Sequence, residues 1–344
     1  MKKLLAIALC LAMVLGAVAC AAPAAPAPEA PAATEAPAAA PEAPEATEAP
    51  AAEEAPLVGI SVPNNPTGWV AAVQWSAKQT ADQLGLNYRL VASENANDQA
   101  NQIDELISMG CKYIVLFPQN DELAVAAQKI MDAGITLVNF DRTLGSTVPN
   151  YYVAGSNPQM GVLGGEYIVE KLGGTGKVVI MNIPNYGAIF TERVDGFKSV
   201  VDKNPGIEIL GEYASDNGAP ETVLPVMSDV LTKHPQIDAI YSTDDEMSKG
   251  ILQAIKEAGR TDIKVITGGG GDKSYFKMMD DYPDIWVSSQ TYPPYMMADC
   301  VKLVDGLING KTYEAKTIIP AECVDRTNYK DYMAAHGITE DAPY

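Results

Sequence analysis

The sequence predicts an α/β protein of two similar lobes, each built on a doubly wound parallel sheet. Three observations predict this class. Strand-like apolar runs alternate with longer segments of helical spacing from residue 57 onward, and this alternation restarts near residue 159. The segment 57–344 is also long enough for two lobes. Alternating strands and helices of this kind give parallel sheets with helices on both faces.

The first series of elements precedes residue 156. Its expected helices end at Gly85, Gly110 and Gly134, where a left-handed cap favours glycine. The expected strands are Val58–Val62, Tyr88–Ala92, Tyr113–Phe117, Thr136–Phe140 and Tyr152–Ala154, with helices near 68–84, 98–109 and 122–133.

The second series follows in the same order of strand and helix. A last apolar run, Thr317–Val324, is expected to cross back between the lobes. The expected strands are Lys177–Asn182, Glu208–Tyr213, Ala239–Ser242, Lys264–Thr267 and Trp286–Ser289, with helices near 159–172, 190–203, 219–233, 246–258, 273–281 and 295–309.

The N-terminal region is typical of an export signal followed by a tether. Lys2 and Lys3 precede an apolar run that ends at Ala19-Cys20. This end resembles a lipoprotein signal and predicts lipidation of Cys20, and an ordinary signal cleaved near Ala19 is the alternative. Residues 21–56 contain only Ala, Pro, Glu and Thr, so they have nothing to bury and predict a disordered tether.

Charge and cysteine content narrow the function classes. The net charge is −20, and without +2 from the signal and −7 from the tether it is −15 over residues 57–344. This acidity argues against nucleic acid as a partner. Cys111, Cys300 and Cys323 are far apart in the sequence and suggest no metal site, so buried free thiols are expected, with one disulfide as the alternative.

Polar and aromatic residues follow the expected strands. In open parallel sheets, ligands bind beyond the carboxyl ends of the strands, so these residues are the candidates for a binding site. They are Pro63-Asn64-Asn65, Asp141-Arg142, Ser215-Asp216-Asn217, Thr243-Asp244-Asp245-Glu246, Gly268–Gly271 with Asp272, and Gln290-Thr291-Tyr292.

Five motifs carry a resemblance to a known family. They are Ser61 to Pro66, Asn139 to Arg142, Thr191-Glu192-Arg193 with Gly196-Phe197, Thr243 to Met247, and Gln290. With them the sequence resembles the type I periplasmic sugar-binding proteins, most closely the ribose-binding branch, over about 57–325. The resemblance implies two lobes joined by three crossovers. It divides the chain into an N-terminal lobe of 57–155 plus 291–319 and a C-terminal lobe of 156–290 plus 320–344.

The resemblance also implies a function and a set of site residues. It implies the extracytoplasmic, lipid-anchored substrate-binding component of an ABC importer. Such a monomer closes its lobes on a monosaccharide or polyol and delivers it to permease subunits, without a metal or cofactor. The residues that correspond to the family's ligand contacts are Asn65, Asp141, Arg142, Arg193, Asp244 and Gln290, and Trp69 is the nearby aromatic residue for stacking.

These residue types suit a sugar, because carboxylates accept, guanidinium groups donate and amides do both toward hydroxyl groups. Local alternatives stay open. Asp141-Arg142 can be a surface ion pair, and Arg193 can pair with Glu192 or Asp195. We assign Asp244 to ligand and Asp245 to a helix cap or a supporting role.

The aromatic and glycine-rich positions also allow more than one interpretation. Trp69 can be a core residue, with Tyr186, Phe190 and Tyr292 as other stacking candidates. Gly173 to Lys177 lacks the pattern of a phosphate loop and is expected to end a helix. Gly268–Gly271 either gives the backbone room beside the ligand or cradles an anion.

An enzyme and a sensor subunit are the alternative functions. An enzyme with a Ser/His/Asp set is disfavoured, because His234 and His336 are the only histidines and neither follows a strand. Glycoside hydrolysis through Asp141 and Asp244 is the remaining enzymatic alternative. A sensor subunit that presents its ligand to a membrane receptor would use the same binding chemistry.

Overall fold

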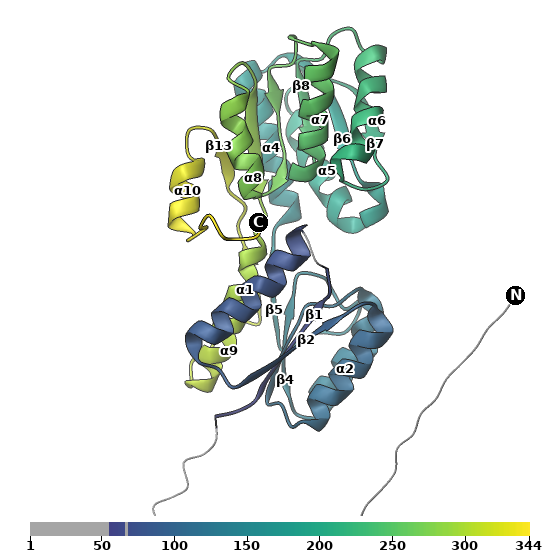
Figure 1. Ribbon diagram of the computed structural model, residues 1–344. Helices are drawn as coiled ribbons and strands as arrows, with labels where there is room; N and C mark the ends of the chain where they lie inside the picture. The colour runs from purple at the N-terminus through teal and green to yellow at the C-terminus, as the bar shows by residue number, and fades with distance from the viewer. Residues whose placement is uncertain (1–54, 66–67) are drawn as a thin grey trace, which may run out of the picture. The chain divides into compact units, whose positions relative to one another are not determined.

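The computed structural model describes residues 55–65 and 68–344, which Figure 1 draws as coloured ribbons. The predicted signal, Cys20 and almost all of the predicted tether lie outside the described residues. No helix in the described part of the chain has the length and apolar character needed to cross a membrane.

The first sheet has six parallel strands in the order β12-β5-β4-β3-β1-β2. Strand β1, which lies between β3 and β2, is buried along its whole length, as expected for a parallel sheet covered on both faces. The strands are β1 (Val58–Pro63), β2 (Tyr88–Ser93), β3 (Tyr113–Leu116), β4 (Thr136–Phe140), β5 (Tyr151–Gly155) and β12 (Lys316–Ile319).

The second sheet follows the order β10-β11-β9-β8-β6-β7, and its strands are parallel. A further strand, β13, pairs with β11 in the antiparallel direction. The strands are β6 (Gly176–Asn182), β7 (Ile207–Ala214), β8 (Ala239–Ser242), β9 (Val265–Ile266), β10 (Gly269–Gly270), β11 (Trp286–Thr291) and β13 (Cys323–Asp325).

Helices cover both faces of each sheet. In the first, α1 (Gly68–Leu84) and α9 (Met297–Ile308) share one hydrophobic core, and α2 (Ala96–Ser108) and α3 (Ala124–Asp132) share another. In the second, α4 (Asn157–Leu172) and α5 (Ala188–Val201) lie on one face. The other face carries α6 (Pro220–Lys233), α7 (Asp245–Ala258), α8 (Lys273–Met278) and α10 (Tyr329–Ala335).

The predicted fold class is confirmed, and the differences are local. The run Thr317–Val324 is divided between two sheets, because Pro320 and the next two residues separate β12 from β13. The sequence analysis did not identify α10 or the two-residue strand β10. The proposed lobe boundary after Gln290 falls inside β11, which ends at Thr291.

The glycine caps and the free thiols agree with the expectations from the sequence, except that one thiol is only half-buried. Gly85, Gly110 and Gly134 adopt positive φ after their helices, and Gly173 caps α4 in the left-handed conformation, as expected. The three described cysteines are free thiols. Cys111 and Cys300 are buried, and Cys323 is half-buried.

Candidate functional site

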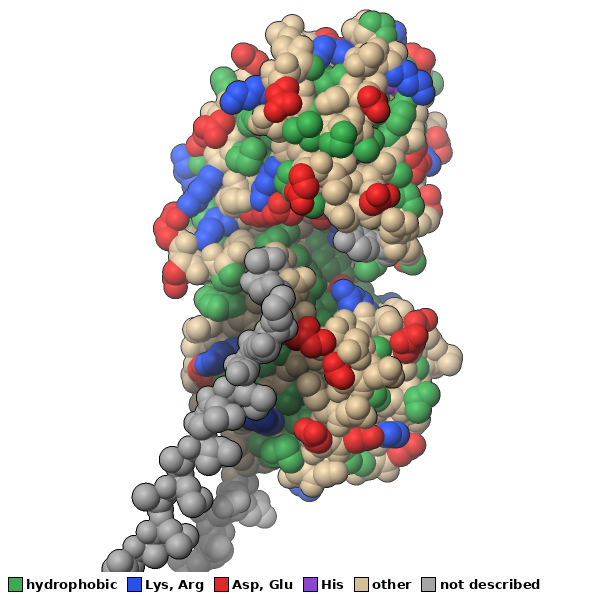
Figure 2. Space-filling model, turned by 45° about the vertical axis from the view of Figure 1, so that its right-hand side comes forward, with side chains coloured by type: hydrophobic (Ala, Val, Ile, Leu, Met, Phe, Trp, Pro, Cys, Tyr) green, Lys and Arg blue, Asp and Glu red, His purple; other side chains and the backbone are tan. Residues whose placement is uncertain are grey.

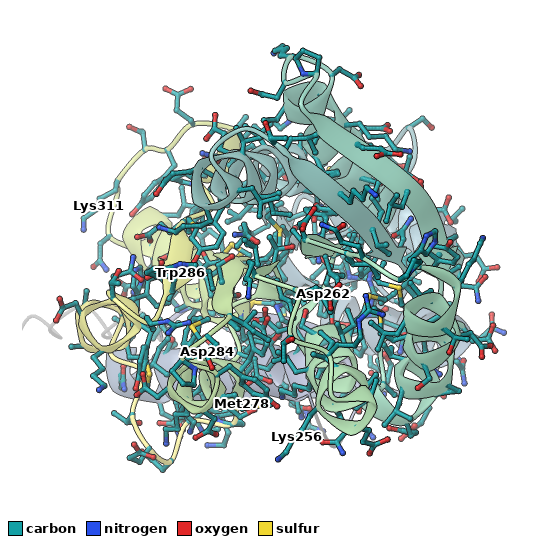
Figure 3. All side chains as sticks on the ribbon, turned by 90° about the horizontal axis from the view of Figure 1, so that it is seen from above. Lys256, Asp262, Met278, Asp284, Trp286 and Lys311 are labelled. Carbon is teal, nitrogen blue, oxygen red and sulfur yellow. The ribbon has the colours of Figure 1, made fainter. Side chains whose placement is uncertain are left out.

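The candidate site lies at the carboxyl ends of the strands, not at their starts. Figure 3 labels Asp262, Asp284 and Trp286, which precede or begin β9 and β11. Asp262 pairs with Arg260 at 2.6 Å and accepts a bond from the backbone N–H of Ile237, so it ties local loops together. Acidic and basic side chains are interspersed over the face in Figure 2 and do not form one charged patch there.

Asp141 follows β4 and is held from two sides. Tyr292 donates a 2.6 Å hydrogen bond to its Oδ1, and Tyr152 donates one to its backbone oxygen, also at 2.6 Å. Its φ of 63° is the only positive φ of a non-glycine residue in the described chain. Burial raises the pKa of the Asp141 carboxyl, while the Tyr292 bond and the charges of Arg142 and Arg193 lower it.

Arg142 points away from an ion pair with its neighbour. Its Nη1 donates to the backbone oxygens of Pro118, at 3.2 Å, and Gln119, and its guanidinium lies 4.8 Å from the centre of the Phe117 ring. No salt bridge joins Arg142 to Asp141 among the described residues. The ion-pair interpretation of Asp141-Arg142 is therefore wrong.

Trp69 combines the two roles that the sequence left open. It is half-buried against the first core, stacks on Phe140 with ring centres 6.0 Å apart, and meets Phe117 edge-on at 5.8 Å. Its Nε1–H donates to the backbone oxygen of Tyr292 at 2.8 Å. Trp69 thus forms an aromatic wall beside Asp141 and Arg142, and stacking on a ligand stays a prediction.

Asn65 is exposed just beyond β1. Its position at the end of this strand agrees with the expected edge of the sheet, and a ligand contact by Asn65 stays a prediction. Of the other aromatic candidates, Phe190 is buried beside Arg193, whose guanidinium lies 4.7 Å from its ring centre. The side chain of Tyr186 lies outside the described part of the structure.

Arg193 is buried between α5 and the end of β8. Its Nε donates to Asn157 Oδ1 at 2.9 Å and its Nη1 to the backbone oxygen of Thr243 at 2.8 Å. This placement depends on a close approach of α4 and α5, because a Cβ on Gly161 would lie 2.0 Å from the backbone oxygen of Arg193. The alternative of a solvated pair with Glu192 or Asp195 is therefore wrong.

The helix cap that we expected at Asp245 is formed by Asp244. Asp244 caps α7, and its Oδ1 accepts bonds from the N–H groups of Glu246 at 2.9 Å and Met247 at 3.2 Å. Of the two roles expected for Asp245, the helix cap is wrong, because the helix begins one residue earlier than expected, and the supporting role agrees with the bonds described below. Burial raises the pKa of Asp244, and the charge of Arg193 lowers it. The ligand role of Asp244 stays a prediction.

Asp245 is fully buried behind this edge. Its Oδ2 accepts hydrogen bonds from the N–H groups of Gly271 and Asp272 and from the hydroxyl of Ser289, at 2.8 to 2.9 Å. The N–H groups at the end of Gly268–Gly271 thus cradle an anion, and that anion is a carboxylate of the chain itself. Burial, together with the charges of Asp272 and Asp244, raises the pKa of Asp245 to about 7. Its Oδ1 is buried without a hydrogen-bond partner among the described residues.

Gln290 is not brought to this group of side chains. It is 1% exposed, and its Nε2 contacts Ser288 Oγ at 3.1 Å and Cys323 Sγ at 3.5 Å. Its Oε1 points toward α4, where it lies 3.5 Å from the position of a Cβ on Gly164. The geometry therefore gives Gln290 a place inside the second sheet, and its ligand role is a prediction without structural support.

Tyr292 connects the predicted residues. Its hydroxyl donates to Asp141, and the guanidinium of Arg193 lies 5.5 Å from the centre of its ring. Sequence reasoning gave Tyr292 only as one stacking candidate. Its position directly after β11, next to a predicted crossover, was the available signal for this linking role.

Four charged groups keep hydrogen-bonding capacity beyond the bonds that position them. The positioning bonds described above use Asp141 Oδ1, Arg142 Nη1, Arg193 Nε and Nη1, and Asp244 Oδ1. They do not use Asp141 Oδ2, Arg142 Nη2, Arg193 Nη2 or Asp244 Oδ2. Two acceptors and two donors of this kind match ligand hydroxyl groups, which accept and donate. Within the described residues, no group of three or more His, Cys, Asp or Glu side chains is arranged to hold a metal ion.

Two doubly wound parallel-sheet lobes, with charged side chains at the strand ends of both, define the class of type I periplasmic binding protein folds. The family model described as a periplasmic binding protein domain matches residues 58–312. The chain belongs to this family.

Proteins that are similar to this chain in sequence are named for the binding of a sugar or a polyol. The chain is 29% identical over 262 residues to the ribose import binding protein of Escherichia coli strain K12, covering 75% of this chain and 86% of that protein. It is 27% identical over 256 residues to the xylitol-binding protein of Mycolicibacterium smegmatis, covering 72% of this chain and 71% of that protein.

Solved structures share the fold. A periplasmic ribose ABC transporter structure from Conexibacter woesei superposes with a TM-score of 0.74 at 18% identity, over 81% of this chain and 95% of that one. An ABC transporter solute-binding protein from Bacillus halodurans with bound myo-inositol gives a TM-score of 0.71 at 21% identity, over 81% and 97% of the two chains.

Proposed function

We propose that this protein binds a monosaccharide or a similar polyol between its two lobes, as the extracytoplasmic substrate-binding component of an ABC importer. The observation that carries the proposal is the link through Tyr292. This one side chain bonds Asp141 of the first sheet's edge and lies under the guanidinium of Arg193, which belongs to the second. The relatives named for ribose and xylitol support this class of ligand.

The proposed mechanism is ligand-dependent closure. Asp141 and Arg142 belong to the proposed N-terminal lobe (57–155 plus 291–319), and Arg193 and Asp244 to the C-terminal lobe (156–290 plus 320–344). A ligand hydroxyl that bonds groups of both lobes favours the arrangement in which they are close, so binding shifts the open–closed equilibrium. Permease subunits would recognise the closed form.

The cellular setting follows from the N-terminal sequence. Cys20 is the proposed lipidation site, and residues 21–56 are the proposed tether between the lipid and the monomeric binding domain. We assign no catalytic residue. Asp141 and Asp244 have the role of hydrogen-bond acceptors for the ligand, and Asp245 has a structural role.

The test is a thermal-shift screen of the mature protein against ribose, xylitol, myo-inositol, allose and other sugars, followed by calorimetric titration. A ligand that binds only the folded state raises the melting temperature, by an amount that grows with ligand concentration above Kd. We expect at least one ligand to bind with 1:1 stoichiometry and to be recovered unchanged. Turnover of the ligand, or no shift with any sugar or polyol, would contradict the proposal.

A further inference from the structure

The segment after α10 is anchored against the second lobe. In Figure 1 this yellow segment runs from α10 back toward α8, to the point marked C. Ile338 and Ala342 are buried in the same hydrophobic core as α8. Lys273 Nζ, in the first turn of α8, donates to the backbone oxygens of Thr339, Glu340 and Ala342, the last two at 2.7 and 2.5 Å. These bonds fix the path of the chain toward Tyr344.

Tyr344 lies at the strand ends of the second sheet. It is 7% exposed, and its backbone oxygen accepts a 2.5 Å bond from the hydroxyl of Tyr295. Its phenol oxygen lies above β10, where a Cβ on Gly270 would come within 2.5 Å of it. Gly270 also has a φ of 141°, so both the backbone conformation and the space at this position require glycine.

The same space is bounded by acidic groups of the candidate site. The position of that Cβ is 3.5 Å from Asp245 Oδ2, and the nearby carboxylates Asp245 and Asp244 act with burial to raise the pKa of the Tyr344 phenol. The phenol therefore stays protonated and can donate. Within the described part of the chain, its hydroxyl makes no hydrogen bond, whereas the Tyr292 hydroxyl bonds Asp141.

Packed tyrosines of this lobe can also leave the hydroxyl unbonded, as Tyr275 and Tyr332 do. Tyr344 differs from them in its place, because its phenol oxygen lies at the end of β10, at the edge of the sheet where the candidate site residues gather. There, like the four charged groups above, it keeps capacity for a ligand. The end of its ring also fills the space that Gly270 leaves at the end of β10.

We propose that Tyr344 is a specificity-determining residue of the second lobe, which bonds a ligand hydroxyl through its phenol and limits the length of the ligand on the side of β10. This inference rests on the proposed binding of a sugar or polyol. It assigns a ligand contact to a residue far in the sequence from every motif that suggested the site.

The test compares Tyr344→Phe, which removes only the hydroxyl, with the wild type, using the panel ligand that gives the largest thermal shift. We expect affinity to fall about five- to tenfold, as for the loss of one hydrogen bond, with an unchanged melting temperature of the free protein. Tyr313→Phe is the matched control, because Tyr313 is exposed and is not a residue of the candidate site. This variant should bind as the wild type does.

A second variant tests the limit on ligand length. Tyr344→Ala should lower affinity for the best wild-type ligand and raise the ratio of affinities for hexoses over pentoses. Wild-type affinity of Tyr344→Phe for every ligand, with unaltered selectivity of Tyr344→Ala, would overturn the role of Tyr344 and leave the proposed function intact. Failure of the wild type itself to bind any sugar or polyol would overturn both.

Discussion

The two halves of the candidate site differ in how deeply their arginines are buried. Arg142 and Arg193 both donate to backbone oxygens and both lie against an aromatic ring. Arg142 is half-buried, however, whereas Arg193 is only 6% exposed. Removing a donor leaves its acceptor without a partner, and this costs more where water cannot replace the donor. The difference predicts that substitutions in the second half cost stability as well as affinity.

The largest effect is expected for Arg193→Met. The variant leaves Asn157 Oδ1 and the Thr243 backbone oxygen buried without their donor, which should lower the free energy of unfolding by roughly 2–4 kcal/mol. Ligand affinity should fall by roughly 100-fold, because a charged donor is lost. Urea unfolding measures the change in unfolding free energy, and calorimetric titration measures the change in ligand affinity. Lys198→Met on the same helix is the control, and an equal loss of stability there would contradict the comparison.

Arg142→Ala should affect affinity much more than stability. Its partners are two backbone oxygens at the partly exposed end of β3, which water can reach after the substitution. We expect a fall in affinity of more than about tenfold and a change in unfolding free energy of less than about 1 kcal/mol. Arg89→Ala, at an exposed arginine of β2, is the control. Unchanged affinity in Arg142→Ala would show that Arg142 of the first half does not contact the ligand.

Tyr292→Phe tests the link between the halves through pH. The Tyr292 bond lowers the pKa of Asp141 against the effect of burial, so its loss should raise that pKa further. Asp141 would then take up its proton at a higher pH during acidification. Affinity should fall roughly threefold near pH 7.5, and by a growing factor toward about pH 5, relative to wild type. A constant ratio across this range would show that Tyr292 does not act on Asp141, and Tyr213→Phe should follow the wild-type profile.

Asp245→Asn should have the smallest effect on ligand affinity, because this carboxylate supports the second half from behind and its expected effect is on stability. The pKa of Asp245 is raised to about 7 in the folded protein, above its ordinary value. A raised carboxyl pKa stabilises the folded state at low pH, and this contribution is lost as pH rises through the folded pKa. Between about pH 4 and pH 7, wild-type unfolding free energy should fall by roughly 1–3 kcal/mol relative to the variant. Parallel pH profiles of the two proteins would contradict this.

The sequence predicted the fold because its signals are local. Apolar runs, helical spacing and glycine stops are each contained in a few consecutive residues, and they placed the strands of both sheets closely. Position after a strand also identified Asp141, Arg142 and Asp244 as candidates. Such signals cannot resolve a shift of one residue at a helix start, which is why the cap was assigned to Asp245 and not to Asp244.

The remaining features depend on contacts between distant segments. The burial of Arg193 requires Gly161 and Gly196 to let α4 approach α5, and nothing in either segment alone indicates this. The position of Gln290 inside the sheet depends on β13, which pairs in the antiparallel direction after a break at Pro320. Tyr344 meets Gly270 across more than seventy positions of sequence, so only the folded chain reveals the pair.

The left-handed backbone of Asp141 has a consequence for how this protein can acquire new ligands. At a φ of 63°, aspartate, asparagine and glycine are accommodated readily, whereas branched or bulky side chains are strained. Evolution or a mutant library can therefore explore few chemistries at this position while keeping the loop intact. Diversification of substrate choice should concentrate on neighbours with ordinary dihedral angles, and a lineage that altered Asp141 would have to remodel the whole turn.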